Sequence, residues 1–181
     1  MKKLLAIIMM LLPMLGGAQE LANFVLMPDG TYQTEDGKDF VVIPFDGKTA
    51  HQIYKELASN VGSTFNDPSK VMSGVEDASI KIRAYANVLI YRFVIGAKQP
   101  LGGYFQLEFK IKDGRVRVSA PYVEDKLDAS FKFTKLVGAY FKDGEIKPNK
   151  QGDYNTIVLQ MNNIVNRILY TSSTQEATED W

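Results

Sequence analysis

The segment 105–118 constrains the fold more than any other part of the chain. Apolar and polar side chains alternate over 105–112, and a second alternating run, 115–118, follows Asp113-Gly114. An Asp-Gly pair between two such runs predicts a β-hairpin with a type I′ turn. A two-residue turn sets the register Lys112 with Arg115, Ile111 with Val116, Lys110 with Arg117 and Phe109 with Val118. Apolar side chains then face each other, so the predicted sheet has one apolar side and one polar side.

Three further segments read as strands of the same sheet. Residues 40–43 form a continuous apolar run, which predicts a buried strand over 39–45. Residues 78–85 alternate with a period of two, which is typical of a half-buried antiparallel strand. Residues 88–95 are almost wholly apolar and predict a central strand, and the glycine-rich segment 96–103 reads as a loop.

Two segments show the period of an amphipathic helix. Thr49 and Gln52 form a capping box, and the helix that follows should end before Pro68. Asp153 is expected to cap a second helix that ends near Tyr170. Each helix carries one apolar stripe, which must be buried against the apolar side of the sheet. The predicted fold is therefore a two-layer α+β sandwich, in which an antiparallel sheet of about five strands is backed by two helices.

The ends of the chain differ in composition from its middle. Lys2 and Lys3 precede an apolar run over 4–15, and small residues at 16–18 suit a signal peptidase, so residues 1–18 predict a signal peptide cleaved before Gln19. Residues 19–38 form an N-terminal arm and residues 39–170 a single α+β domain, which includes the irregular segment 119–152 with a small hairpin at 142–145. Residues 171–181 are polar and acidic and read as a disordered tail. We expect an exported protein, periplasmic or secreted, without a transmembrane segment in the mature chain.

Composition and motifs exclude many chemistries. The chain has no cysteine and one histidine, His51, so thiol catalysis and cysteine-ligated metals are excluded. Gly47-Lys48-Thr49 has the place of a phosphate-binding loop, but Val42 stands where that loop needs a glycine. The five Asp-Gly pairs lack the acidic residues of a calcium loop and read as turns. We therefore assign no catalytic residue, cofactor or metal, and read His51 as structural or solvated.

Charge placement is the informative feature. Residues 80–117 carry eight basic and two acidic side chains, whereas the chain after residue 18 has nineteen basic and twenty-one acidic ones. Strand periodicity places most of these cations on the polar side of the sheet, away from the helices. The candidate binding residues are Lys81, Arg83, Tyr85, Lys110, Lys112, Arg115 and Arg117. A solvated sheet face is the alternative interpretation of this pattern.

Two runs of the chain resemble a known family. The run 43–50, IPFDGKTA, continued by Ile53-Tyr54, resembles the opening of a domain of unknown function with a TBP-like fold, found in secreted proteins of Bacteroidetes. The run 109–117, FKIKDGRVR, is similar to the central hairpin of that family. The resemblance covers about residues 40–125 and implies a curved antiparallel sheet backed by helices, and export from such a bacterium. It brings no catalytic residues.

The sequence therefore predicts an exported envelope module of α+β class, not an enzyme, which binds a partner protein or an anionic glycan through its basic sheet face. A hydrolase with a carboxylate pair and a structural subunit of an envelope assembly are the alternatives. Nucleic acid is not an expected partner, because an exported protein does not meet the chromosome and a shared fold does not imply a shared function.

Overall fold

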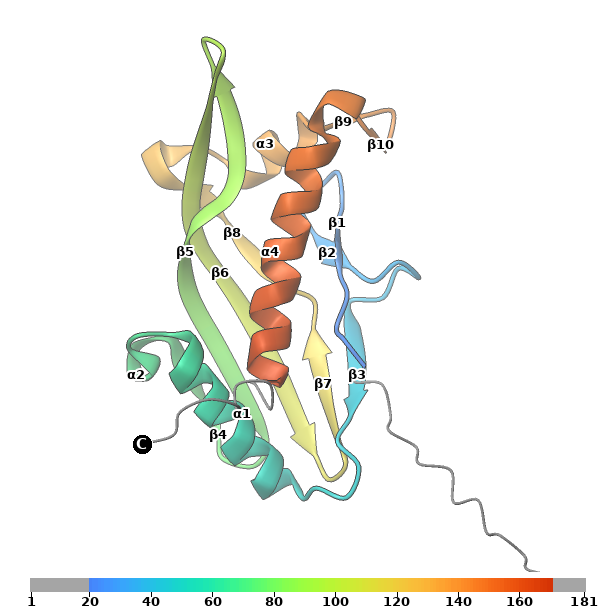
Figure 1. Cartoon of the computed structure of the whole chain (residues 1–181), viewed down its shortest axis with the longest axis vertical. Coiled ribbons are helices and arrows are strands. Elements are labelled where there is room, and N and C mark those ends of the chain that lie inside the picture. Colours follow the sequence, from blue (N-terminus) through green and yellow to red (C-terminus); the bar gives the residue numbers. More distant parts are fainter. Residues whose placement is uncertain (1–19, 171–181) are drawn as a thin grey trace, which may run out of the picture.

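Two long antiparallel strands form the centre of the molecule (Figure 1). The computed structural model describes residues 20–170. Strands β5 (Ser79–Val94) and β6 (Ala97–Lys112) have 16 residues each and pair along their length, with one irregularity between Ala86 and Ile90. Their shared hairpin sets the long axis of the fold.

The remaining strands complete a curved, antiparallel, six-stranded sheet. The order is β3-β7-β6-β5-β4, and β8 pairs with β6 beyond the end of β7. Their bounds are β3 (Phe40–Pro44), β4 (Met72–Val75), β7 (Arg115–Ser119) and β8 (Tyr122–Leu127). The predicted α+β class and curved antiparallel sheet are confirmed, with six strands where about five were expected.

Helices α1 (Ala50–Thr64) and α4 (Gln151–Leu169) cover one side of the sheet (Figure 1). Their buried side chains, such as Leu57 and Met161, join those of the strands in one core. The Thr49 capping box of α1 is confirmed, since both of its hydrogen bonds are present. The predicted cap of α4 is wrong: α4 begins two residues before Asp153, which lies in its first turn and pairs with Lys98.

Alternation along the strands decides which side chains enter the core. Phe105, Leu107, Phe109 and Ile111 are all buried, and the polar residues between them point away from the helices. The register predicted for the 105–118 hairpin is confirmed at all four pairs. The apolar side of the sheet is thus the side that α1 and α4 cover.

The predicted type of the turn at Asp113-Gly114 is wrong. A type I′ turn needs positive φ at both central residues, and here Gly114 has φ 70° while Asp113 is not in that region. The turn is tied to the start of α1 instead. The Asp113 carboxylate accepts a hydrogen bond from Ala50 N–H at 2.7 Å, and Gly114 N–H donates to the Lys48 carbonyl at 2.9 Å.

The predicted loop at 96–103 is also wrong, because residues 97–103 belong to β6 and only Gly96 lies in a turn. The hairpin turns at Ile95-Gly96, so the two strands predicted over 78–95 are one continuous strand, β5. The two glycines that suggested a loop serve close packing. A Cβ at Gly102 would lie 2.6 Å from the carbonyl oxygen of Ala86, and one at Gly103 would lie 2.7 Å from Leu127.

Strand β3 forms where it was predicted, but it is not buried on both sides. It lies at the edge of the sheet and pairs only with β7 among the described strands. Ile43 is buried, whereas Val42 is 45% exposed on the opposite side. A continuous apolar run therefore marked a half-buried edge strand.

Two asparagines of α4 hold the N-terminal arm. Asn162 accepts a hydrogen bond from Phe24 N–H at 3.0 Å and donates to the Phe24 carbonyl at 2.9 Å. Asn166 makes the same pair of bonds with Ala22, at 2.9 and 2.8 Å. The spacing of the two asparagines along α4 matches that of Ala22 and Phe24 along the arm, because four helical residues rise about 6.0 Å and two extended residues span about 6.6 Å. Phe24 and Ala22 are thereby drawn into the core.

The segments outside the sheet and the long helices are short. The arm contains the hairpin of β1 and β2, and the predicted hairpin at 142–145 is confirmed as β9 and β10. The bounds are β1 (Val25–Leu26), β2 (Tyr32–Gln33), α2 (Pro68–Val71), η1 (Asp128–Ser130), α3 (Phe133–Gly138), β9 (Phe141–Lys142), β10 (Glu145–Ile146) and η2 (Pro148–Lys150). All five Asp-Gly pairs are turns, with positive φ at each glycine.

The predicted signal peptide and polar tail lie outside the described residues. Within residues 20–170, none of the helices has the length and hydropathy needed to span a bilayer.

Candidate functional site

The candidate site is the side of the sheet opposite α1 and α4, here called the outer face. All seven residues predicted from the sequence lie on it. Six are exposed and Arg117 is half-buried. Their placement follows the predicted strand phase, while their role in binding stays a prediction. Further outer-face residues are Phe40, Val42, Ser73, Tyr104, Gln106, Glu108, Ser119, Tyr122 and Glu124.

Glu108 lies between two of the predicted cations. Its carboxylate is 3.3 Å from Lys81 Nζ, directly across the ladder, and 3.7 Å from Lys110 Nζ. Burial acts to raise the pKa of Glu108, but the hydrogen bond from Lys81 and the charge of Lys110 outweigh it, so the pKa is lowered. Two cations of the outer face therefore share one counter-charge.

Arg83 is held by a carboxylate from β8 and by an aromatic ring. Its Nε donates to Glu124 at 2.6 Å, and its Nη2 donates to the second carboxylate oxygen at 3.0 Å. The guanidinium also lies 4.0 Å from the centre of the Tyr104 ring. Such a bidentate and stacked arginine keeps a fixed orientation.

Tyr85 extends this cluster toward the end of β8. Its hydroxyl donates to Asp128 at 2.6 Å, and this bond is the main reason that the pKa of Tyr85 is raised. The rings of Tyr85 and Tyr104 meet edge to face with centroids 5.5 Å apart. Arg83, Tyr85 and Tyr104 thus form one ordered patch.

The remaining three cations lie toward the β6–β7 turn. Arg117 stacks 4.0 Å from the Phe40 ring centre and faces Lys110 across the ladder. Lys112 and Arg115 also face each other. Neither makes an ion pair with a described residue. Uncompensated positive charge is therefore concentrated at this end of the outer face.

An open pocket of about 440 Å³ lies in the middle of the outer face. Lys81, Arg83, Glu108 and Tyr122 contribute to its wall. Because charged side chains of both signs line the pocket, it suits a ligand that carries both hydrogen-bond donors and acceptors, such as a peptide segment.

Sequence reasoning missed the carboxylates and most of the aromatic residues of this face. Tyr104 would have been found by extending the alternation of 105–112 back by one residue, since Phe105 points inward. Tyr122 and Glu124 flank the buried Val123 and show the same alternation over a shorter run. The hydrogen bond between Tyr85 and Asp128 depends on the path of the chain after β8, and no local sequence pattern predicts it.

The Glu124–Arg83 pair predicts a pH dependence of stability. The hydrogen bond from Arg83 holds the pKa of Glu124 below its usual value of 4.5, so the pair stabilises the fold above that pH and loses this contribution as the pH falls through the lowered pKa. We expect Glu124→Gln to lower the free energy of unfolding slightly at neutral pH and to have no effect in strong acid. Urea unfolding across this pH range measures the difference. Glu35→Gln, a loss of the same charge in an exposed turn, is the matched control, and an equal slope in both variants would contradict the assignment.

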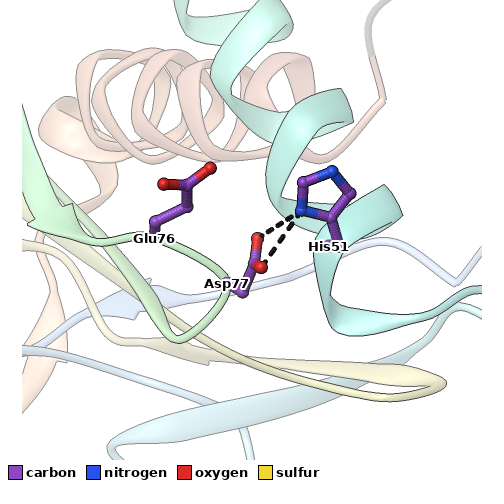
Figure 2. Close-up of side chains that lie close together, drawn as sticks. All are labelled: His51, Glu76 and Asp77. Atoms are coloured by element: carbon purple, nitrogen blue, oxygen red, sulfur yellow. Dashed lines mark hydrogen bonds and ion pairs between the residues drawn. The ribbon is translucent and has the colours of Figure 1, made fainter.

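A second cluster lies at the start of α1 (Figure 2). His51 Nδ1 is 3.0 and 3.1 Å from the two carboxylate oxygens of Asp77, which lies with Glu76 in the turn between β4 and β5. Within residues 20–170, these three form the one group of His, Cys, Asp or Glu side chains with ligand atoms all within 4.8 Å. A nitrogen and two carboxylates are ligand types that zinc accepts.

The same contacts also have a structural role. Helix α1 has no acidic residue in its first turn. Asp77 and Asp113 bring carboxylates to that turn from two sheet turns, where negative charge is favourable because of the helix dipole. The sequence reading of His51 did not include Asp77, because 26 residues separate the two.

Of the comparisons with known proteins, only the one with solved structures finds similar proteins. No protein-family model matches the chain, and a search of curated proteins finds no match. The chain is similar to the crystal structure of a TBP-like protein from Parabacteroides distasonis, with 8% identity, a TM-score of 0.49, and coverage of 71% of this chain and 87% of that one. It is also similar to a DUF4468 family protein from Bacteroides ovatus, with 9% identity, a TM-score of 0.48, and coverage of 75% and 87%. The first of these two proteins carries the TBP-like description that the sequence resemblance names.

Proposed function

We propose that the chain is an exported, non-enzymatic module that binds a partner protein through the outer face of its sheet. One observation carries the proposal: Tyr85, Tyr104 and Tyr122 are 45%, 41% and 60% exposed on this face, beside ordered arginine and mixed charge. Tyrosine and arginine are among the residues enriched in protein interfaces and among the few that contribute most of the binding energy. The segment 1–18, in which Lys2 and Lys3 precede an apolar run, supports export.

The pairing of charges favours a protein over a purely anionic ligand. Glu108 and Glu124 already neutralise Lys81 and Arg83 in part, so the centre of the face presents both signs of charge. Complementary charges on a partner would then set its orientation more than its affinity. Exposed aromatic rings supply the apolar area that such an interface needs.

The proposal is tested by removing the rings without disturbing the core. We expect the double variant Tyr104→Ala and Tyr122→Ala to capture its partner from envelope extracts about 30-fold less well, since an interface hot spot contributes about 2 kcal/mol or more. Leu159→Ala is the matched control, because Leu159 is 60% exposed, like Tyr122, but lies on α4. Equal capture by the double variant and the unaltered protein would refute the proposal.

A second candidate ligand, an anionic glycan, rests on Lys112 and Arg115. These opposed cations make no ion pair with a described residue and repel each other, so an anionic group between them would relieve the repulsion. We expect binding of polygalacturonate to weaken steeply with salt and to disappear on Lys112→Glu with Arg115→Glu. Binding that survives both changes would exclude this site.

A further inference from the structure

The tip of the β5–β6 hairpin exposes two large apolar side chains. Ile95 is 101% exposed and Phe93 is 49% exposed. The tip projects beyond the helices at one end of the long axis (Figure 1). It is remote from the middle of the outer face, so these side chains belong to a separate surface.

Ile95 also adopts a backbone conformation that its side chain disfavours. Ile95 and Gly96 have φ 46° and 77°, the signs of a type I′ turn. The β9–β10 hairpin makes the same kind of turn with Asp143 at φ 52° and Gly144 at 85°. An aspartate suits this position, whereas a β-branched residue there is strained. The chain thus places an aliphatic side chain at a fully exposed position at a conformational cost, which points to a functional role.

Cations lie directly behind the apolar tip. Lys98 faces Phe93 across the ladder, and Lys150 Nζ lies 3.2 Å from the centre of the Phe93 ring. Arg92, one residue before Phe93, stacks on Phe131. Asp153, which pairs with Lys98, is the acidic side chain in contact with this group. Ile95 therefore lies outermost at the turn, and Phe93 lies behind it together with an excess of positive charge.

We propose that this tip inserts into the surface of a phospholipid bilayer that contains anionic lipids. Ile95 and Phe93 would enter the boundary between headgroups and acyl chains, while Arg92, Lys98 and Lys150 contact the phosphates. The order of apolar and charged groups with depth matches that of a lipid interface. The convex, projecting shape needs no complementary socket, which a protein partner would have to supply.

The absence of cysteine from the chain allows a site-specific test. In the full chain, Ala97→Cys places an environment-sensitive fluorophore beside the tip and leaves Ile95 intact. We expect its emission to shift to the blue on addition of vesicles of equimolar phosphatidylcholine and phosphatidylglycerol. The same label at Leu159→Cys, exposed on α4, should not respond. A shift at Leu159 without one at Ala97 would overturn the proposal.

The strained isoleucine provides a variant that should not harm folding. Ile95→Asn suits the left-handed turn, so we expect a fold at least as stable as the original. The substitution removes one large aliphatic side chain from the contact with lipid and should weaken partition of the protein into the vesicles by about 10- to 100-fold. The fluorophore attached at position 97 measures this partition. Leu159→Gln, which removes a comparable exposed side chain, should leave partition unchanged. An unaltered response with Ile95→Asn, or an equal response to pure phosphatidylcholine vesicles, would refute insertion driven by this tip.

Discussion

Replacement of Asn162 by leucine is expected to lower the free energy of unfolding by about 2–6 kcal/mol. The side chain is 8% exposed and satisfies both backbone groups of Phe24, which is itself fully buried. Leucine has the same branched shape but can make neither bond, so a buried N–H and a buried carbonyl would lose their partners at about 1–3 kcal/mol each. The arm would then leave the core or remain there at this cost.

Asn163→Leu is the matched control for this prediction. Asn163 is the next residue of α4 and is exposed, so the same substitution there should change stability by about 0.5 kcal/mol or less. Urea unfolding of both variants and the unaltered chain measures the difference. Similar values for the two variants would show that the arm does not depend on Asn162.

Truncation of Phe109 to alanine should destabilise the fold by about 3–5 kcal/mol. The ring is fully buried in the middle of β6, where it faces Ile80 on one neighbouring strand and Val118 on the other. The cavity left by alanine would lie between the sheet and the helices, where three strands limit collapse.

Lys110→Ala, one residue further along β6, tests the strand phase. Lys110 is exposed on the outer face and opposes Arg117, so its removal should change stability little and relieves a repulsion between like charges. Thermal and urea unfolding of the two variants should therefore differ by several kcal/mol. Equal losses would mean that the alternation of buried and exposed residues is shifted.

Local patterns were enough to predict the centre of the fold. The alternation over 105–118 predicted the register of β6 and β7, because a shift of one residue would move every apolar side chain to the polar side. The capping box predicted the start of α1 for a similar reason, since its two hydrogen bonds join residues three apart.

The loop prediction was wrong where close packing, and not a turn, requires a glycine. Gly102 and Gly103 suggested a loop, but Tyr85 and Leu127 approach them too closely for a Cβ. The true turn at Ile95-Gly96 was missed because isoleucine is the opposite of what turn statistics favour.

Contacts between distant segments account for the rest. Asn162 and Asn166 read as polar positions of an amphipathic helix, and nothing near them in sequence indicates an extended arm more than 130 residues away. The same limit applies to the candidate site. The cations of the outer face could be placed by periodicity, but their carboxylate partner Glu124 comes from a strand that was not predicted.

The claim that the outer face binds a partner protein is tested most directly by photo-crosslinking in envelope extracts. A photoreactive phenylalanine analogue would replace Tyr122 on the outer face or Leu159 on α4, two side chains of equal exposure. We predict a discrete crosslinked protein with the analogue at position 122 and none with the analogue at position 159. Adducts from position 159 with none from position 122 would contradict the assignment of the outer face as the binding surface.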